Sequence, residues 1–214
     1  MAKRTYELNA KQRILDAAKT VFAEKGFDGA RVDEIAKIAN APKSLIYYHF
    51  TSKDEILEYL LNDCLEQYRA ILTGVNTNVA TPGERTISEQ VRKFYLKFLE
   101  EQVDLLRIMS MEILKKQSSK AHLAFKFAKM LVDVEDEVFP GSSGSSHEER
   151  AARMVTEFFT GQLPIVAFMS LRESWAEIFD IDLETLSQQF MDAYEITYGT
   201  YYKQKRAHWQ KHAS

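Results

Sequence analysis

The spacing of the apolar residues constrains the fold of this chain most strongly. They recur three and four positions apart, which is the repeat of an α-helix that turns one face toward a core. One such stripe comprises Ile14, Ala17, Ala18, Val21 and Phe22, and another comprises Leu183, Leu186, Phe190, Tyr194 and Tyr201. No segment shows the period of two that indicates a strand. The sequence therefore predicts an all-α fold of about nine helices.

Capping residues predict where the first helices begin and end. Asn9, with a glutamine three positions later, is a candidate N-cap for the first helix, and Gly26 is its expected end. Asn40 tolerates positive φ and is expected in a turn after a short second helix. Pro42 then suits the first position of a short third helix, where its missing N–H costs nothing.

The later part of the chain is also expected to be helical, with identifiable breaks. A long fourth helix is predicted from Lys53 to about Thr73, ended by Gly74 and the polar residues from Asn76 to Ala80. The Gly- and Ser-rich stretch 139–146 is typical of a flexible connection. Pro164 is expected to kink the helix that follows, because an interior proline removes one backbone hydrogen bond. A last helix is expected over about 183–205.

Composition restricts the class of protein. Hydrophobic residues make up 45% of the chain and charged residues 28%, with only 8 glycines and 4 prolines, as in ordinary globular proteins. The longest apolar run, 163–169, is too short to cross a bilayer, and no secretory signal is evident. The single cysteine, Cys64, cannot form an internal disulfide. We therefore expect a cytoplasmic protein with no membrane partner.

Charge is unevenly distributed along the sequence. Residues 1–53 contain ten Lys/Arg and six Asp/Glu, a net charge of +4, whereas residues 54–214 have a net charge of −7. A basic segment attached to an acidic body suggests that the first segment alone meets a polyanion.

The stretch from Arg31 to Lys53 has the dimensions of a helix-turn-helix, with two helices of about eight residues joined by a turn of about three. Ile46 and Phe50 are expected to anchor its second helix. The residues left facing outward are Lys43, Ser44, Leu45, Tyr47, Tyr48 and His49. Their hydroxyl and ammonium groups can donate to phosphate oxygens. Lys53 is expected in the first turn of the next helix, where free backbone N–H groups favour an anion.

Residues along the first sixty positions also follow a family pattern. They are Val21-Phe22, Gly26-Phe27, Ile35-Ala36, Lys43, Ile46 to Phe50, Ser52-Lys53 and Leu57. In these positions the chain resembles the DNA-binding domain of the TetR family of transcriptional regulators. The family often has Ser or Thr where this chain has Ala30 and Arg31, and Gly where it has Asn40. The resemblance implies a DNA-binding domain over 1–53 and a helical ligand-binding and dimerisation domain over 54–214.

The resemblance further implies a repressor that binds a palindromic double-stranded DNA operator as a homodimer and is released by a largely apolar small molecule. The expected DNA contacts are Arg31, Lys43, Ser44, Leu45, Tyr47, Tyr48, His49 and Lys53. Leu45 is a candidate for contact with a thymine methyl group, whereas tyrosine and lysine suit phosphates. Two alternatives stay open: a transcriptional activator, and a helical adaptor that does not bind DNA.

The effector and dimer sites are expected in the second domain. Methionine and aromatic residues suit an adaptable apolar pocket, although they also fill ordinary cores. The pocket candidates are Met109, Met111, His122, Phe125, Met130, Phe168, Met169 and Trp175. The dimer candidates are Phe158, Phe159, Leu186, Phe190, Tyr194 and Tyr201, which could instead pack inside one protomer.

Catalysis is not expected. The sequence lacks a His-Glu-x-x-His motif, a phosphate-binding loop, a Gly-x-Ser-x-Gly motif, the glycines of a dinucleotide-binding fold and a cysteine pair. His208 and His212 are four positions apart, but a solvated tail accounts for them. We therefore predict no enzyme activity, no metal site and no cofactor.

Overall fold

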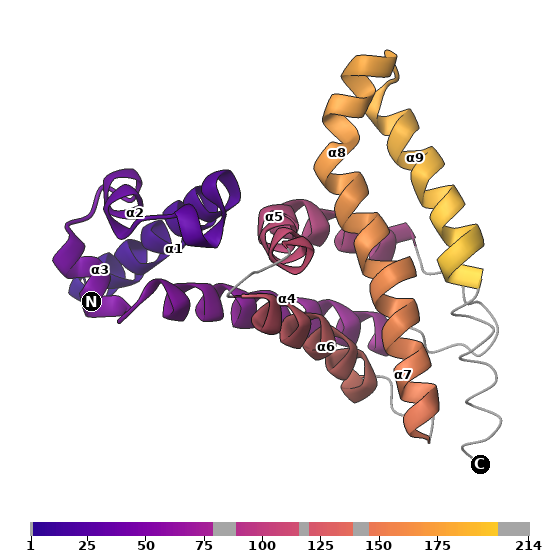
Figure 1. The fold of residues 1–214 in the computed structure, drawn as a ribbon, viewed down its shortest axis with the longest axis horizontal. Helices are drawn as coiled ribbons and strands as arrows, with labels where there is room; N and C mark the ends of the chain where they lie inside the picture. The colour runs from indigo at the N-terminus through magenta and orange to yellow at the C-terminus, as the bar shows by residue number, and fades with distance from the viewer. Residues whose placement is uncertain (1, 79–88, 116–119, 139–145, 201–214) are drawn as a thin grey trace. The chain divides into compact units, whose positions relative to one another are not determined.

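The computed structural model describes residues 2–78, 89–115, 120–138 and 146–200, and every regular element within them is helical (Figure 1). The elements in these ranges are α1 (Ala2–Gly29), α2 (Val32–Ile38), α3 (Lys43–His49), α4 (Lys53–Asn78), α5 (Glu89–Leu114), α6 (Ala121–Val138), α7 (His147–Thr156), η1 (Glu157–Gln162), α8 (Leu163–Phe179), α9 (Leu183–Tyr194) and η2 (Glu195–Gly199). The predicted all-α fold of about nine helices is confirmed for this part of the chain. The connection at 139–145, Tyr201 and the histidines at 208 and 212 lie outside it.

The chain folds into two compact units. The head unit comprises Met1–Glu66 and Asp104–Phe125, and the body unit comprises Gln67–Val103 and Lys126–Ser214. The head unit thus joins α1, α2 and α3 to the beginning of α4, the end of α5 and the first residues of α6. The functional boundary at Lys53 stays a prediction, because packing groups segments without regard to what they bind.

An apolar core holds the head unit together. Its fully buried side chains include Ile14, Val21, Phe22, Ile35, Ile46, Ile56 and Leu57. The rings of Phe22 and Phe27 lie 5.3 Å apart at the end of α1. Burying one such aliphatic or aromatic side chain contributes about 1.5–3 kcal/mol, so this cluster fixes how the short helices α2 and α3 sit on α1.

Two predicted helix boundaries are wrong and two local predictions hold. The helix α1 begins at Ala2 rather than at Asn9, because no glycine or proline before Gly26 interrupts it. Gly26 leaves helical geometry, as expected, with φ 69°. Asn40 also has positive φ, at 48°. The helix α4 continues through Gly74 to Asn78, since a single glycine inside a helix costs only about 1 kcal/mol.

In the body unit, α7, η1 and α8 form one continuous helical run that α9 follows in an antiparallel hairpin (Figure 1). The π-helical segment η1 ends just before the first turn of α8, which contains Pro164. The N–H of Leu163 donates to the carbonyl of Phe158, five residues back. A proline cannot donate to the carbonyl four residues back, and the wider turn beside Pro164 is where the sequence predicts a kink.

The hairpin between α8 and α9 is fixed by its turn and by aromatic packing. Asp180 adopts a left-handed conformation, with φ 51°, and the side chain of Asp182 accepts a hydrogen bond from the N–H of Thr185 at 2.8 Å. Phe168 and Phe190 stack with their ring centroids 3.9 Å apart. These contacts lock α9 onto α8 within the protomer.

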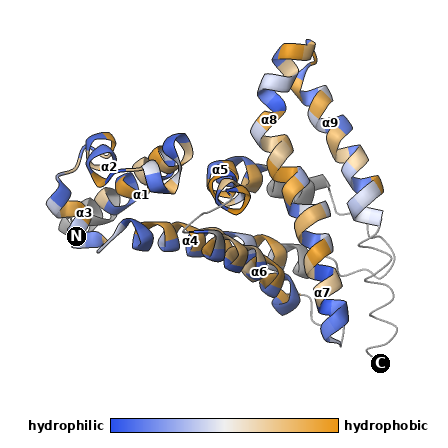
Figure 2. Cartoon of the chain, viewed as in Figure 1, coloured by the Kyte–Doolittle hydropathy of each residue, from blue (hydrophilic) through white to orange (hydrophobic). Residues whose placement is uncertain are grey.

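The continuous helix His147–Phe179 is unusually apolar for its exposure. By length and composition it could cross a membrane, but only 28% of its most apolar window is buried, and a core helix passes the same test. Figure 2 shows hydrophobic residues, coloured orange, along α8 as far as its end. The exposed apolar side chains on this run include Val155, Phe159, Leu171, Trp175, Ile178 and Phe179. We call these six residues the apolar face.

Candidate nucleic-acid interface

The turn between α2 and α3 sets the orientation of α3. The N–H of Ala41 donates to the carbonyl of Ala36 at 3.0 Å, and Asn40 supplies the left-handed residue of the turn. Pro42 is the N-cap of α3 rather than its first helical residue, with an extended backbone at φ −66° and ψ 149°. Ile35 and Ile46, both fully buried, then hold the two helices against the core. The turn and the core together leave one face of α3 outward.

That outward face carries hydrogen-bond donors. The side chains of Tyr48 and Tyr47 are 70% and 54% exposed, which is unusual for such large rings on a folded domain. Lys43 and Ser44 are exposed beside them, and Leu45 is half-buried. A tyrosine presents an apolar ring and a polar hydroxyl, so the face can both pack against sugar and donate to phosphate oxygens.

His49 lies deeper than the sequence predicts. Its ring packs edge-on against Tyr48, with the centroids 5.1 Å apart, and its Nε2 atom is shielded from solvent without a hydrogen-bond partner in the described part of the chain. The expectation that His49 faces outward with the tyrosines is therefore only partly met. Its contact with Tyr48 favours a role in holding that ring.

Lys43 is tied to the preceding helix. Its ammonium pairs with the carboxylate of Asp33 on α2. This hydrogen-bonded pair raises the pKa of Lys43 above its usual value, so the side chain stays cationic across the physiological range. Both side chains are more than half exposed, so the pair is weak and Lys43 can exchange Asp33 for a phosphate.

Lys53 has a structural role that the sequence did not predict. Its Nζ atom donates to the carbonyls of Phe27 at 2.8 Å and Ala30 at 2.9 Å, and it lies 4.7 Å from the centroid of the Phe27 ring. These carbonyls belong to the end of α1 and have no helical partners of their own. Lys53 therefore fastens the beginning of α4 to the end of α1. Its contact with DNA stays a prediction.

Arg31 occupies the N-cap of α2 with an extended backbone, and its side chain makes no capping hydrogen bond. The residue is exposed. A guanidinium at the beginning of a helix can reach a phosphate without giving up an existing cap, and the contact of Arg31 with DNA stays a prediction.

Further contacts that sequence reasoning missed stiffen the head. Arg13 donates from Nε to the carbonyl of Ala39 at 3.2 Å, which satisfies the end of α2. Lys11 lies over the ring of Tyr59 at 3.8 Å. Their signal in the sequence was weak, because a cation inside a long helix is normally a solvated side chain.

Elements that follow α4 also hold the head unit. Lys115, at the end of α5, pairs with the fully buried carboxylate of Glu112 and lies 3.8 Å from Asp28 on α1. Lys120, just before α6, pairs with Asp54 and lies 4.7 Å from the ring of Phe27. These contacts hold the residues just before α2 and just after α3 in place. Lys53 connects the same two segments.

The predicted pocket residues fall in both units. Met109, Met111, His122 and Phe125 belong to the head unit, and Met130, Phe168, Met169 and Trp175 belong to the body unit. Met109 and Met169 are buried, whereas Met111, Phe125 and Trp175 are large exposed side chains. The structure thus does not gather the eight residues into one interior group within either unit, and the pocket stays a prediction.

The predicted dimer residues are placed unequally. Phe159 is 61% exposed, and Phe158 packs edge-on against it with the centroids 5.0 Å apart. Phe190 is used within the protomer by its stack on Phe168, and the hydroxyl of Tyr194 donates to the carbonyl of Gly161 at 3.3 Å. Leu186 is half-buried. Four further exposed apolar residues lie on α8, in the apolar face, and Ile196 on η2 is 73% exposed.

Comparison with known proteins bears on this interface. Residues 14–60 match the family model described as "Bacterial regulatory proteins, tetR family". Over 62 residues the chain is 44% identical to the biofilm operon icaADBC HTH-type negative transcriptional regulator IcaR of Staphylococcus aureus strain Newman. It is 40% identical over 58 residues to the regulator of the same name in Staphylococcus epidermidis.

These sequence matches are partial. They cover 29% and 27% of this chain, and 33% and 31% of the two relatives, so the chain spans about a third of their length. A solved structure, of the fatty acid degradation regulator FadR from Bacillus halodurans, covers 86% of this chain and is itself covered to 96%, with a TM-score of 0.55 and 21% identity. That likeness extends over most of the chain and concerns the fold alone.

Proposed function

We propose that this member of the TetR family of transcriptional regulators is a repressor that binds a palindromic DNA operator as a homodimer and is released by a largely apolar small molecule. The observation that carries the proposal is the outward face of α3, on which Tyr47 and Tyr48 are exposed beside Lys43 and Ser44. Exposing two tyrosine rings is unfavourable in a free domain unless a partner covers them.

The chemistry of this face suits a DNA major groove. A seven-residue helix is short enough to enter the groove end-on, and its hydroxyl and ammonium groups can donate to the phosphates on either side. Tyr47, Tyr48, Lys43 and Arg31 are proposed as phosphate contacts. Ser44 and Leu45, at the beginning of α3, are proposed to read base edges, with Leu45 suited to a thymine methyl group.

Useful affinity requires two copies of this face. A single helix of seven residues reads few base pairs, whereas a dimer doubles the contacts and makes the operator palindromic. The apolar face offers the surface for the second protomer, because it is exposed in the single chain and lies on one continuous helix. We propose that Phe158 and Phe159 belong to this interface, together with Trp175 and its neighbours on α8.

Repression is proposed because the curated relatives that resemble the head are negative regulators by name. Release by a small molecule requires only that the effector prefers a protomer arrangement with the wrong spacing of the two α3 helices. A coupling of about 1–3 kcal/mol gives a 5–150-fold change in operator affinity.

Selection of bound sequences from a random duplex library tests the proposal. We expect an enriched palindrome whose half-sites are separated by about one helical turn. Replacing Ser44 by Ala or Leu45 by Ala should change the enriched sequence, whereas Tyr59→Phe, on α4, should leave it unchanged. Enrichment of no duplex would favour the adaptor alternative. A reporter placed behind the selected sequence then separates repression from activation.

A further inference from the structure

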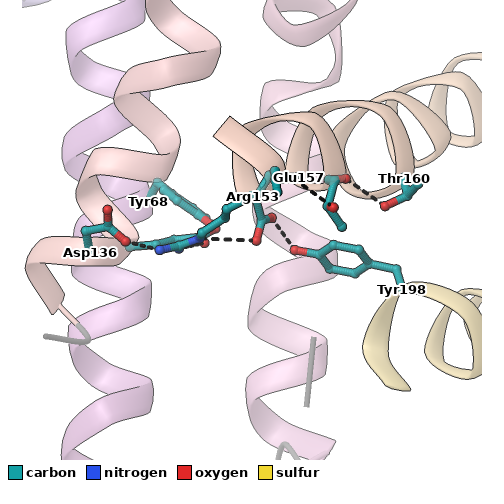
Figure 3. A network of polar contacts seen from close by, with 9 residues as sticks. Tyr68, Asp136, Arg153, Glu157, Thr160 and Tyr198 are labelled. Atoms are coloured by element: carbon teal, nitrogen blue, oxygen red, sulfur yellow. Dashed lines mark hydrogen bonds and ion pairs between the residues drawn. The ribbon is translucent and has the colours of Figure 1, made fainter. Parts of the chain in front are cut away.

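A buried cluster of charge lies in the body unit and contains none of the residues proposed to bind DNA (Figure 3). At its centre is Arg153 on α7, whose side chain is 2% exposed. Its guanidinium lies 2.9 Å from Glu135, pairs with Asp136 and lies 3.7 Å from Glu157. The side chain of Glu157 is 4% exposed and that of Glu135 is 13% exposed. The cluster therefore draws together the end of α6, α7 and η1.

Two tyrosine hydroxyls complete the cluster. Tyr68 on α4 donates to Glu135, and Tyr198 on η2 donates to Glu157 (Figure 3). On the same side, the hydroxyl of Tyr194 donates to the carbonyl of Gly161. The segment from the end of α9 through η2 is therefore attached to η1 by two tyrosine hydroxyls, one of which ends on a carboxylate.

Close packing makes this attachment specific. A Cβ atom built on Gly161 would lie 3.0 Å from Cε2 of the Tyr198 ring, a separation at which the ring would have to shift. Tyr194 and Tyr198 also lie against each other, with centroids 5.1 Å apart. The missing side chain at position 161 thus lets the Tyr198 ring approach η1 and bring its hydroxyl to Glu157.

Charge within the cluster does not balance. Among the described residues it contains three carboxylates and one guanidinium. Two other arginines of the body unit pair with carboxylates outside the cluster: Arg69 on α4 with Glu137 on α6, and Arg172 on α8 with Glu100 on α5. On η2, Glu195 is exposed. Keeping Glu135 and Glu157 both ionised around one guanidinium in a low-dielectric interior is unfavourable, and binding a proton relieves it.

We propose that Glu157 is a proton-binding switch whose protonation holds η2 on η1. When its proton passes to solvent, the new carboxylate repels Glu135, and the arrangement that buries both carboxylates becomes less favourable. The hydrogen bond from Tyr198 favours the ionised form of Glu157, but burial and the charge of Glu135 outweigh it. Separation of Tyr198 from Glu157 would then admit water to the ionised group. Burial, and secondly the charge of Glu135, raises the pKa of Glu157 to about 7. A transition at this pKa lies within the physiological range.

The direction of the effect follows from linkage. The folded chain holds this proton more tightly than the unfolded chain, whose glutamate pKa is close to the ordinary 4.5. The stabilisation is fully present below pH 4.5 and is lost as pH rises through about 7. If the body unit also forms the dimer, which rests on the proposed function, the dimer should weaken over the same range.

Unfolding by urea at pH 5 and at pH 8, at one fixed protein concentration, tests the switch without DNA. For the wild-type chain the folded-to-unfolded ratio should fall on the order of 50-fold more than for Glu157→Gln, which keeps the shape but cannot ionise. The matched control Glu177→Gln removes an exposed carboxylate on α8 and should follow the wild type. Equal pH dependence in wild type and Glu157→Gln would overturn the proposal.

A second measurement does not depend on the variant remaining folded. In wild-type protein labelled with ¹³C at the glutamate carboxyls, the resonance of Glu157 should titrate near neutral pH, and burial should raise the pKa of Glu135 above those of exposed glutamates as well. Tyr198→Phe, which keeps the ring but removes the donor, should shift that midpoint. The proposal fails if every resonance titrates below about pH 5.5. It also fails if the neutral titration persists in Glu157→Gln and disappears in Glu135→Gln.

Discussion

In the head unit, most charged side chains lie near the surface and bind backbone carbonyls or one another, whereas in the body unit a set of charges lies in the interior. Of the four buried polar side chains in the described residues, Gln102, Arg153 and Glu157 belong to the body unit and only Glu112 belongs to the head. An apolar core with surface clamps makes a stiff platform for α3. An interior that contains charge is sensitive to protons and to polar neighbours. The head unit is therefore suited to presenting the surface of α3, and the body unit to responding to protons and polar neighbours.

Removing Arg153, the central cation of the buried cluster, should have the largest effect on stability. Arg153→Met would leave Glu135, Asp136 and Glu157 without their shared guanidinium, and we expect a loss of about 3–5 kcal/mol in the free energy of unfolding. Arg150→Gln, an exposed position on the same helix, is the matched control and should cost less than about 0.5 kcal/mol. Urea unfolding measures both. A loss below about 1 kcal/mol in Arg153→Met would mean that the cluster does not stabilise the body unit.

The contrast also predicts how Lys53 acts in the head. Lys53→Met keeps the aliphatic stem but leaves the carbonyls of Phe27 and Ala30 without their donor, so we expect a loss of about 1–3 kcal/mol in stability. Lys37→Met, an exposed change on α2, should leave stability almost unchanged. If Lys53→Met weakens duplex binding at unchanged stability, the lysine contacts phosphate and is not mainly a clamp.

A surface residue of α3 should affect binding without affecting stability. Tyr48→Phe removes a hydroxyl from a ring that is 70% exposed, so the melting temperature should not change. We expect about tenfold weaker binding to all duplexes alike, because a hydrogen bond to a phosphate carries no sequence information. Fluorescence anisotropy with two unrelated duplexes measures this. A changed preference between them would assign Tyr48 to base reading.

Substitution of two glycines in the body unit should give the smallest changes in stability. Ala in place of Gly74, where no atom lies within 4 Å of the new Cβ, should stabilise α4 by about 0.5–1 kcal/mol. Ala in place of Gly161 should instead destabilise by about 1 kcal/mol, because the Tyr198 ring must move. Thermal unfolding compares the two variants. Equal stabilisation by both would show that Tyr198 is not held tightly against η1.

Sequence patterns predict the head better than the body. Local rules determine the turn at Asn40, the break at Gly26 and the outward tyrosines, since each depends on neighbours within a few residues. Nothing in the sequence marks Arg153 as buried, because its partners Glu135 and Asp136 lie on another helix, α6. The position of Lys53 in the first turn of a helix predicts an anion as its partner. Its partner in the structure, the carbonyl of Phe27, is 26 residues away in sequence, so local reasoning does not find it. Contacts between distant segments leave no periodic signal.

The salt dependence of duplex binding tests the central claim, that α3 presents a phosphate-binding face, most directly. For the wild-type chain on a selected duplex, the logarithm of the association constant should fall linearly with the logarithm of salt concentration. The slope for Lys43→Gln should be shallower by about one, the change expected for a single lost phosphate contact. Absence of duplex binding at low salt, or an affinity that does not change with salt, would contradict the account.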